Sequence, residues 1–462
     1  MYSARYRLVK MSTPTFPLPA GYYYGPVNGP QQSISGQYQT DKPEWVAGLK
    51  LWQQSLGIET TGIWDEVSRC HAQLLQVSKG WQAPPGNGYI YLKEWNEVVQ
   101  GGWRPEVGKS PQFARFIGDI TGVPITGQFG VGGTDLGIPF RLGNGSVMYL
   151  FGDTFEGEKP GSAGWRSPVG LRSQTGATAG TSLATGVRWD NAAGGGYAKE
   201  LTENYHQTKI AVGKGGAYSF SEYSVIPSGA VYVNGKGYMF TSSVHDWNSK
   251  NWITNFCFVS TCSDIYGENW SRSDTFWPNN GRADLHQQIT VADGRDGYIY
   301  AVGSSFSRAI PGMLLMRVEA NEASLLDIGS WNEWGFQNNM WSWGPPGHGT
   351  PFLSDSCGET SLQKVGDKWV FAYFDPDRYS VVIRVTDEID HVWSDPVAYV
   401  HGGDWLPAYD RGYGYPAGSY AQLYGGYIHP DSTPDSLFLT VSQWNTGAGH
   451  PYRAMLFEVS LP

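Results

Sequence analysis

Cysteine is scarce in this chain of 462 residues. The sequence has no CxxC pair and no histidine at the spacing of a zinc site, so we expect neither a metal nor a cofactor. Cys257 and Cys262 are close enough in sequence for a local disulfide, which is the alternative to free thiols. We predict buried free thiols for all of the cysteines: Cys70, Cys257, Cys262 and Cys357.

Long hydrophobic runs and a basic bias are also missing. No run of 18 apolar residues occurs, and Met1–Lys10 lacks the apolar core of a secretion signal, so we expect neither membrane insertion nor a classical signal peptide. Met11 is an alternative start. The 32 Lys and Arg residues against 42 Asp and Glu residues give a net charge of −10. Without a basic stripe, this charge argues against nucleic-acid binding and favours a neutral or cationic ligand.

Aromatic residues and glycine, by contrast, are abundant. The chain contains 20 Trp, 28 Tyr, 19 Phe and 61 Gly, while only 16% of its residues are charged. This composition is typical of a turn-dense β-protein with exposed aromatic side chains. Because sugar rings present C–H faces that stack on aromatic rings, such a surface also suits sugar binding.

The hydrophobic pattern divides the chain into four parts. Residues 1–40 are rich in Pro, Gly, Tyr and Ser without a period, and we expect an extended arm that orders against a partner. Residues 41–102 predict a small domain of about three helices, because apolar residues recur there at three- and four-residue steps. Residues 103–123 are a predicted linker, and residues 124–462 are a predicted β-domain of short strands and frequent turns.

The β-domain repeats one hairpin pattern. Each copy has two apolar runs around a turn cluster, and further strands between several copies would lie on their outer side. The hairpins lie within Val131–Glu156, Gly229–Ser243, Gln287–Ser305, Glu359–Asp375 and Leu423–Trp444. A unit of about 69 residues with an inner hairpin and outer strands is typical of a propeller blade. We therefore predict an all-β five-bladed β-propeller preceded by a small α-helical domain; a jelly roll or sandwich, the alternative, does not predict equivalent hairpins.

The first hairpin has an acidic residue at the open end of each strand. With the turn centred near Asn144–Gly145, Asp135 on the first strand would lie opposite Thr154 and next to Asp153. Hydrolysis of a glycosidic bond needs two carboxylates, one to protonate the leaving oxygen and one to activate water or attack the sugar. We predict Asp135 and Asp153 as this catalytic pair; the alternative is that each is a turn or cap residue.

Hairpin ends from different blades should share one pocket, because the inner strands of a propeller begin or end at the same face. On this basis we predict further supporting or substrate-binding residues: Glu222, Asp284, His286, Glu359 and Trp444. For His286, a core histidine without such a role is an equal alternative. Trp341 lies in a loop rich in Trp and Gly, residues 331–349, which predicts either a groove wall or a contact with the next blade.

The helical domain contains an LxxWQ helix, a turn and an LLQ helix, in WVAGLKLWQQSLGIETTGIWDEVSRCHAQLLQVSKGW, followed by GYIYLKEWNEV. These motifs resemble the three-helix peptidoglycan-binding domain of cell-wall hydrolases. The resemblance implies peptidoglycan as a partner, although WQAPPGNGYIYLKEW is compressed relative to that family. A helical adaptor whose core is formed by Trp45, Trp52 and Trp64 is the alternative.

The β-domain contains the phrases VGGTDLGIPF, YLFGDTFEG, GWRSPVGLRS, CGETSLQKVGDKWVFAYFD and GGYIHP. Together they resemble the endo-D-arabinanase propellers of mycobacteria, of other actinobacteria and of their phages. The resemblance implies hydrolysis of internal α-D-arabinofuranosyl bonds in cell-wall arabinogalactan and lipoarabinomannan. It places the acidic pair at Asp135 and Asp153, and Glu359 would orient the sugar or tune a pKa.

The arm GYYYGPVNGPQQSISG and the helical domain resemble the N-terminal part of mycobacteriophage tail and lysis proteins. The resemblance implies a protein on the phage tail or released at the host envelope, with arabinan, peptidoglycan and other tail proteins as partners. Two other classes stay open: a receptor-binding tail protein that grips arabinan without cutting it, and a structural tail component. Two neighbouring carboxylates favour the enzyme, because a lectin does not need them.

Overall fold

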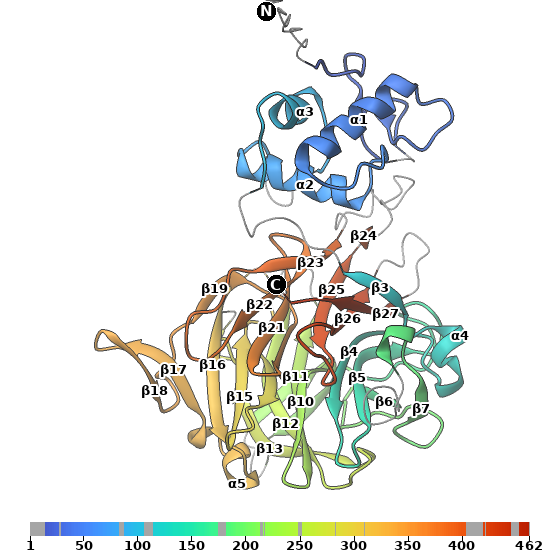
Figure 1. The fold of residues 1–462 in the computed structure, drawn as a ribbon. Helices are drawn as coiled ribbons and strands as arrows, with labels where there is room; N and C mark the ends of the chain where they lie inside the picture. The colour runs from blue at the N-terminus through green and yellow to red at the C-terminus, as the bar shows by residue number, and fades with distance from the viewer. Residues whose placement is uncertain are drawn as a thin grey trace, which may run out of the picture. The chain divides into compact units, whose positions relative to one another are not determined.

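The computed structural model describes residues 14–26, 29–82, 87–105, 114–173, 182–212, 216, 218–247, 252–281, 283–308, 310–402, 419–420, 422–444 and 452–461. The chain forms two compact units, Met1–Pro111 with Ala408–Ser419 and Gln112–Pro407 with Tyr420–Pro462. Helices α1 to α3 belong to the first unit, and the second consists mainly of strands (Figure 1). No described helix combines the length and the apolar character needed to cross a membrane.

Three helices form the N-terminal unit: α1 (Pro43–Leu56), α2 (Glu66–Ser78) and α3 (Leu92–Val99). Helix α1 has a proline in its first turn and ends at Gly57, whose φ of 75° suits a residue without Cβ. Asp65 caps α2 by accepting a hydrogen bond from the Ser68 amide at 2.8 Å. The helices enclose one apolar core in which Trp52 and Trp64 are buried, so the predicted helical region is confirmed.

Part of the predicted arm contributes to this core. Two short parallel strands, β1 (Tyr23–Tyr24) and β2 (Ser33–Ile34), precede the helices. The Tyr24 hydroxyl donates to the Trp45 carbonyl at 2.7 Å, and Tyr24 and Ile34 are buried in the same cluster as the helical side chains. The described part of the arm is therefore an integral part of the helical unit.

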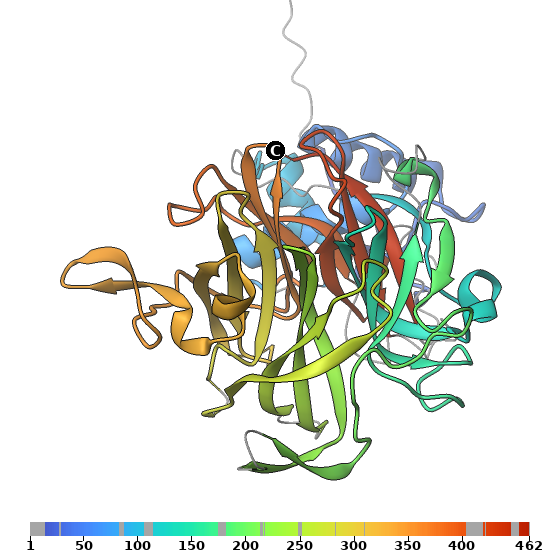
Figure 2. The ribbon, with the colours of Figure 1, turned by 90° about the horizontal axis from the view of Figure 1, so that it is seen from below.

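Five sheets of four or more strands form the blades of a β-propeller, which confirms the predicted fold (Figures 1 and 2). Each blade begins with one of the predicted hairpins, and the first strands of neighbouring blades pack against one another around the ring. These inner hairpins are β4 (Gly133–Arg141) with β5 (Val147–Phe155), β10 (Ser224–Val233) with β11 (Lys236–Asp246), β14 (Gln288–Asp293) with β15 (Tyr298–Ser304), β20 (Thr360–Val365) with β21 (Lys368–Asp375), and β25 (Leu423–Ile428) with β26 (Leu437–Gln443).

Outer strands complete each blade. They are β6 (Val169–Ser173) and β7 (Trp189–Ala192); β12 (Ile253–Cys262) and β13 (Trp270–Pro278); β16 (Pro311–Glu319), β17 (Asn332–Gln337), β18 (Met340–Gly344) and β19 (Leu353–Ser356); β22 (Ser380–Thr386), β23 (Val397–Gly402) and β24 (Ser419–Tyr420); and β27 (Arg453–Val459) with β3 (Arg115–Asp119). The connections contain α4 (Val123–Thr126), η1 (Gly127–Phe129), η3 (Leu183–Thr185), β8 (Thr208–Val212), β9 (Tyr218–Glu222), α5 (Glu322–Leu325) and η4 (Ile328–Ser330). The hairpin β17–β18 projects from the third blade (Figures 1 and 2).

The inner strands follow from continuous apolar runs bounded by turn residues. Every residue of β25 and β26 is buried, as expected for strands that pack on both faces. Between β10 and β11 the turn residues Asn234 and Gly235 have φ of 50° and 83°, the left-handed conformation of a tight two-residue hairpin turn. Local sequence therefore fixes where each hairpin turns.

The last blade is closed by a strand from the beginning of the β-unit. Strand β3 pairs antiparallel with β27 at the outer edge of that blade. Arg453 donates to Asp119 at 2.7 Å, and Arg115 forms an ion pair with Glu458. Residues 115–119, which the sequence pattern assigns to a linker, are thus part of the propeller.

All four cysteines are buried and none forms a disulfide, which confirms the prediction of free thiols. Burial raises the pKa of the Cys257 and Cys357 thiols to about 12. Because the thiolate is the reactive form, burial disfavours reaction of Cys257 and Cys357 at neutral pH.

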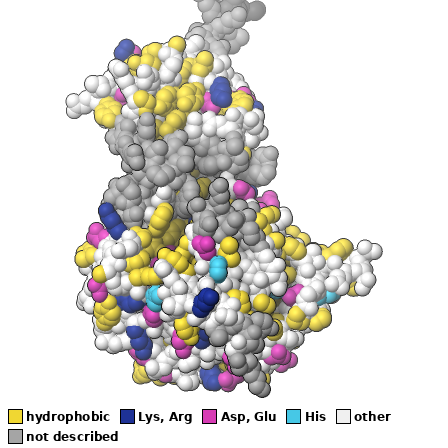
Figure 3. Space-filling model, turned by 180° about the vertical axis from the view of Figure 1, so that it is seen from behind, with side chains coloured by type: hydrophobic (Ala, Val, Ile, Leu, Met, Phe, Trp, Pro, Cys, Tyr) yellow, Lys and Arg dark blue, Asp and Glu magenta, His cyan; other side chains and the backbone are white. Residues whose placement is uncertain are grey.

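The surface drawn in Figure 3 has mixed charges. Lys and Arg side chains are scattered among Asp and Glu, with hydrophobic side chains between them. On this face, the described side chains show no segregated basic patch of the kind that binds a nucleic-acid backbone.

Candidate active site

A distorted stretch of β4 positions Asp135. The pairing of β4 with β5 is regular near the turn, but its register shifts on both sides of Leu136. Leu136 and Gly137 have φ of 65° and 78°, a conformation that is uncommon for leucine. The Leu136 amide donates to the Ser442 hydroxyl of β26 at 2.7 Å, which holds the distortion in place. Bulges of this kind redirect side chains next to functional sites.

The distortion changes the partner of Asp135. The predicted pairing with Thr154 is wrong, because Thr154 pairs with Thr134. Asp135 lies instead beside Gly152 and Asp153, and a Cβ at Gly152 would be only 2.4 Å from Asp135 Oδ1. Glycine at this position therefore makes room for the carboxylate. The two aspartates remain neighbours, although the register differs from the one that the turn predicts.

Asp135 is placed to hold a proton near neutral pH. Burial raises the pKa of Asp135 from 3.8 to about 7, and the charge of Asp153 adds to this rise. The Tyr424 hydroxyl donates to Oδ2 at 2.9 Å. This hydrogen bond and one from Tyr452 lower the pKa of Asp135 and so oppose the rise. Oδ1 is buried without a hydrogen-bond partner among the described residues, which disfavours the ionised form.

Two donors fix one oxygen of Asp153. The Trp165 indole N–H donates to Oδ1 at 2.8 Å, and the Ser224 hydroxyl donates to the same oxygen at 2.9 Å. The pKa of Asp153 is raised, because burial outweighs these hydrogen bonds and the nearby His206, which lower it. Oδ2 accepts no hydrogen bond from a described residue, so it is the oxygen left for a ligand or for water.

A third carboxylate, Glu359, faces the same pocket and is paired with a buried arginine. The Arg308 guanidinium donates to Glu359 Oε1 at 2.5 Å, and the Gly425 amide donates to Oε2 at 3.3 Å. Arg308 also lies over the rings of Trp252 and Tyr424, at 4.8 and 4.9 Å from their centroids. The arginine therefore connects Glu359 to the aromatic wall of the pocket.

These side chains line one pocket of about 510 Å³, a volume typical of small-ligand sites. It brings together four of the predicted site residues, Asp135, Asp153, Glu359 and Trp444. Nine of its 19 lining residues are aromatic: Phe155, Trp165, Tyr223, Trp247, Trp252, Phe306, Tyr424, Trp444 and Tyr452. Adjacent carboxylates with different surroundings provide an acid and a base, and the aromatic rings suit the C–H faces of a sugar.

Glu222 does not line this pocket. It is fully buried at the end of β9, where it forms an ion pair with Arg272 at 3.0 Å. It also accepts a hydrogen bond from the Ser243 hydroxyl at 2.6 Å. Glu222 therefore connects β9 to β11 and β13 inside the second blade.

His286 and Asp284 also lie outside the pocket lining. His286 Nδ1 is 3.0 Å from Asp284 Oδ1, and Nε2 is 3.2 Å from Glu333 Oε1. Burial lowers the pKa of His286, but the hydrogen bonds and charges of the two carboxylates outweigh it and raise the value to about 9. The three side chains form a charged cluster that ties the segment before β14 to the hairpin β17–β18.

The two predicted tryptophans occupy different places. Trp444 lines the pocket and is 44% exposed, whereas Trp341, which is 41% exposed, lies on the projecting hairpin β17–β18 outside the lining. Trp341 stacks on Trp334 with the ring centroids 6.0 Å apart. Trp343 of the same hairpin donates to Asp390 of the next blade at 3.0 Å. Residues 331–349 therefore contact the next blade, as one of the two predicted alternatives has it, and Trp341 does not form a wall of this pocket.

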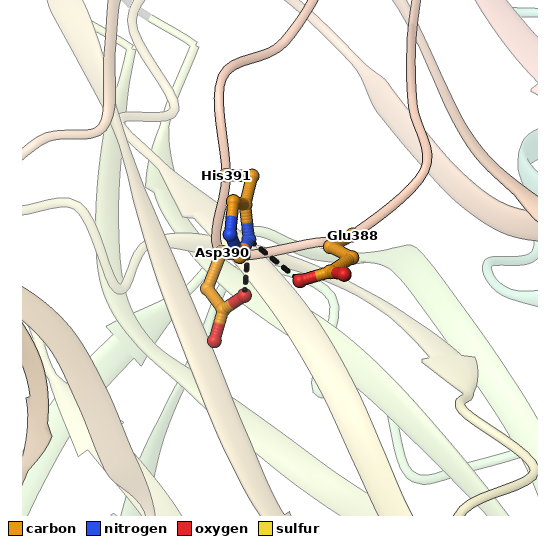
Figure 4. A group of neighbouring side chains, drawn as sticks. All are labelled: Glu388, Asp390 and His391. Atoms are coloured by element: carbon orange, nitrogen blue, oxygen red, sulfur yellow. Dashed lines mark hydrogen bonds and ion pairs between the residues drawn. The ribbon is translucent and has the colours of Figure 1, made fainter.

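Among the described residues, one cluster has metal-ligand chemistry, and it lies in the loop after β22 (Figure 4). His391 Nδ1 is 3.0 Å from Glu388 Oε2 and 3.1 Å from Asp390 Oδ1. The side chains of His391 and Glu388 are 65% and 68% exposed, and the contacts are those of a surface ion-pair cluster. None of the three residues lines the pocket.

The sequence pattern does not identify the side chains that hold the aspartates. Trp165 and Tyr452 lie in connections between strands, and Arg308 follows the end of β15, so no local period marks them. Ser224 and Tyr424 are the first and second residues of the inner strands β10 and β25. Placement at a hairpin end, the signal that identified Asp135, could have found those two.

The fold and the pocket define the class of this protein: a five-bladed β-propeller in which acids and aromatic side chains from several blades line one pocket. Within this class, the chain belongs to the family described as a domain of unknown function, DUF4185, whose model matches residues 124–458. The match begins within α4 and ends within β27, so it covers the propeller except for β3 and the end of β27.

Relatives occur in a mycobacterium and in fungi. The chain is 27% identical over 345 residues to an uncharacterized 35.9 kDa protein in the asd 3′ region of Mycolicibacterium smegmatis, covering 74% of this chain and 96% of that protein. It is 30% identical over 337 residues to the notoamide biosynthesis cluster protein J′ of Aspergillus versicolor, covering 69% of this chain and 83% of that protein.

Among solved structures, the chain is similar to a proposed hydrolase of Bacteroides ovatus, with 17% identity and a TM-score of 0.49 over 72% of this chain and 87% of the other. It is also similar to an arabinanase of Bacillus subtilis, with 12% identity and a TM-score of 0.36 over 70% of this chain and 94% of the other.

Proposed function

We propose that this protein is a glycoside hydrolase that cleaves internal bonds of D-arabinan. The observation that supports it best is the pair of neighbouring carboxylates, Asp135 and Asp153, in one aromatic pocket, with the pKa of Asp135 raised to about 7. A carboxyl group with such a pKa is protonated in a large fraction of molecules at neutral pH. Glycosidic bond hydrolysis needs one such acid next to an ionised carboxylate.

The surroundings of the two aspartates suggest their roles. Asp135 has an unpartnered buried oxygen, so it holds the proton and would donate it to the leaving oxygen. Asp153 receives two hydrogen bonds on Oδ1, which stabilise its ionised form, and it would act as the base or as the nucleophile. Glu359, neutralised by Arg308, would orient the sugar rather than exchange protons with it.

The lining of the pocket favours a neutral, ring-shaped ligand. Aromatic side chains from several blades make up about half of its lining, and they offer stacking surfaces for sugar rings. The pocket has more acidic than basic side chains, so an anionic ligand would be repelled.

The substrate and the biological setting rest on the sequence motifs. The resemblance to endo-D-arabinanases suggests internal α-D-arabinofuranosyl bonds of arabinogalactan and lipoarabinomannan, and similarity to a Mycolicibacterium protein is consistent with such a substrate. We further propose delivery to the cell envelope by a phage, on the virion tail or during lysis. In that setting the helical unit would bind peptidoglycan or other tail proteins.

Release of reducing ends from purified mycobacterial arabinogalactan tests the function. We expect the wild type to release oligosaccharides, and Asp135→Asn and Asp153→Asn each to lower the rate at least about a hundredfold. Asp387→Asn is the matched control, because Asp387 is 81% exposed on a loop outside the pocket, and it should keep full activity. Full activity in either pocket variant would contradict the assignment. Binding of arabinogalactan by the wild type without release of oligosaccharides would indicate the non-catalytic, receptor-binding role.

A further inference from the structure

Trp165, which donates to Asp153, is itself confined by two rings. The His206 imidazole meets the indole edge-on, with the ring centroids 4.6 Å apart and an interplanar angle of 76°. Tyr223 lies on the indole with its centroid at 5.6 Å. These contacts restrict rotation of the indole, whose N–H donates to Asp153 Oδ1 at 2.8 Å.

Glu200 holds His206 in this place. His206 Nε2 is 2.7 Å from Glu200 Oε1, and the same oxygen accepts a hydrogen bond from the Ser167 amide at 3.1 Å. The Asn204 side chain donates to the Ser167 carbonyl at 2.9 Å and accepts from the His206 amide at 3.1 Å. Because Ser167 is close to Trp165 in the chain, this network joins the backbone of the tryptophan to the imidazole that packs on it.

The backbone at His206 is unusual. His206 and Gln207 have φ of 42° and 68°, so two consecutive residues with side chains adopt the left-handed region. This conformation is unfavourable, and it persists where the surrounding contacts determine it, often next to functional sites. Here it presents the imidazole to Trp165 and to Glu200.

We propose that His206, held by Glu200, is a positioning residue that acts on Asp153 through Trp165. This inference rests on the proposed function. His206 does not line the pocket, whereas Trp165 and Asp153 do. Its charge acts on Asp153 directly, and its packing acts on Asp153 through the indole. With the indole held, Oδ1 of Asp153 stays engaged and the carboxylate keeps one orientation during the reaction.

A double-mutant cycle tests the route of this effect. We compare the wild type, His206→Ala, Trp165→Phe and the double variant by kcat and KM on arabinan oligosaccharides. Each single variant should lower kcat about tenfold with little change in KM, because an oriented hydrogen bond to a carboxylate is weakened or lost. The double variant should lose little more than Trp165→Phe alone, because only the direct charge effect of His206 on Asp153 is left once the indole N–H is absent.

Further variants keep the result interpretable. His206→Gln retains a donor for Glu200 and should recover most of kcat. If the alanine variant does not fold, His206→Asn replaces it in the cycle, because asparagine tolerates the left-handed backbone but is too short to pack on the indole. His391→Ala is the matched control, since His391 is also ion-paired to a glutamate but lies outside the pocket, and it should match the wild type. Additive losses in the double variant, with an active wild type, would overturn this inference alone. A wild type without turnover would overturn the proposed function and this inference with it.

Discussion

Asp135 should make the protein less stable at neutral pH than an uncharged residue of the same shape. In the unfolded chain this carboxyl titrates near its ordinary pKa of 3.8, whereas burial raises the pKa to about 7 in the folded protein. Between these values the folded state keeps a proton that the unfolded state has released. The contribution of this group to stability is therefore fully present below about pH 4, falls as the pH rises, and is constant above about pH 7.

The size of the effect follows from the two pKa values. A difference of about three pKa units corresponds to at most about 4 kcal/mol of unfolding free energy. Asparagine has nearly the same shape and does not titrate, so Asp135→Asn should leave stability nearly unchanged at about pH 4 and raise it by up to that amount at about pH 8. The same variant should be inactive, so stability and activity would change in opposite directions.

Urea unfolding at several pH values measures this difference. The unfolding free energy of Asp135→Asn should exceed that of the wild type by an amount that grows between about pH 4 and pH 7 and then levels off. The exposed Asp387, changed to Asn in parallel, should show no comparable gain, because burial is the main cause of the shift. An Asp135→Asn variant that is less stable than the wild type at about pH 8, or a gain that does not depend on pH, would refute the reasoning.

Two further outcomes follow from the pocket. Tyr424→Phe removes a donor that stabilises ionised Asp135, so the pKa of Asp135 should rise by about one to two, and the alkaline limb of the pH profile of kcat/KM should move up by the same amount. An unmoved limb would show that Asp135 is not the acid. Trp444→Ala should raise KM about fivefold through lost stacking, whereas Trp341→Ala, with a similar exposure but on the projecting hairpin, should leave KM unchanged. Equal effects of the two substitutions on KM would contradict the placement of the substrate.

Strand order and hairpin positions were accessible from the sequence because they depend on local signals. Apolar runs bounded by turn residues such as Asn234–Gly235 located the inner hairpins, and their repetition indicated the propeller. Strand β3 was missed, since its partner β27 lies at the other end of the β-unit and no local pattern reports such a pairing.

The site was predictable only in part, because contacts between distant parts of the chain decide where its side chains lie. Placement at hairpin ends identified Asp135 and Asp153 as neighbours, but the bulge at Leu136 depends on a hydrogen bond to Ser442 from another blade. Glu222 also lies at a strand end, yet it points to Arg272 and away from the pocket lining, a pairing that only the folded blade defines.

The pairing of β3 with β27 also has a consequence for how the chain folds during synthesis. Arg115 and Glu458, which bond across this contact, are separated by 343 residues, so the first strand leaves the ribosome long before its partner. Until then the ring is open, and the edges of β3 and of the unfinished blade are free to pair with other chains. A fragment cut to the family match at residues 124–458 would lack β3 and would keep one such edge permanently. Residues 115–119 thus cover a strand edge that would otherwise be open to pairing with another chain.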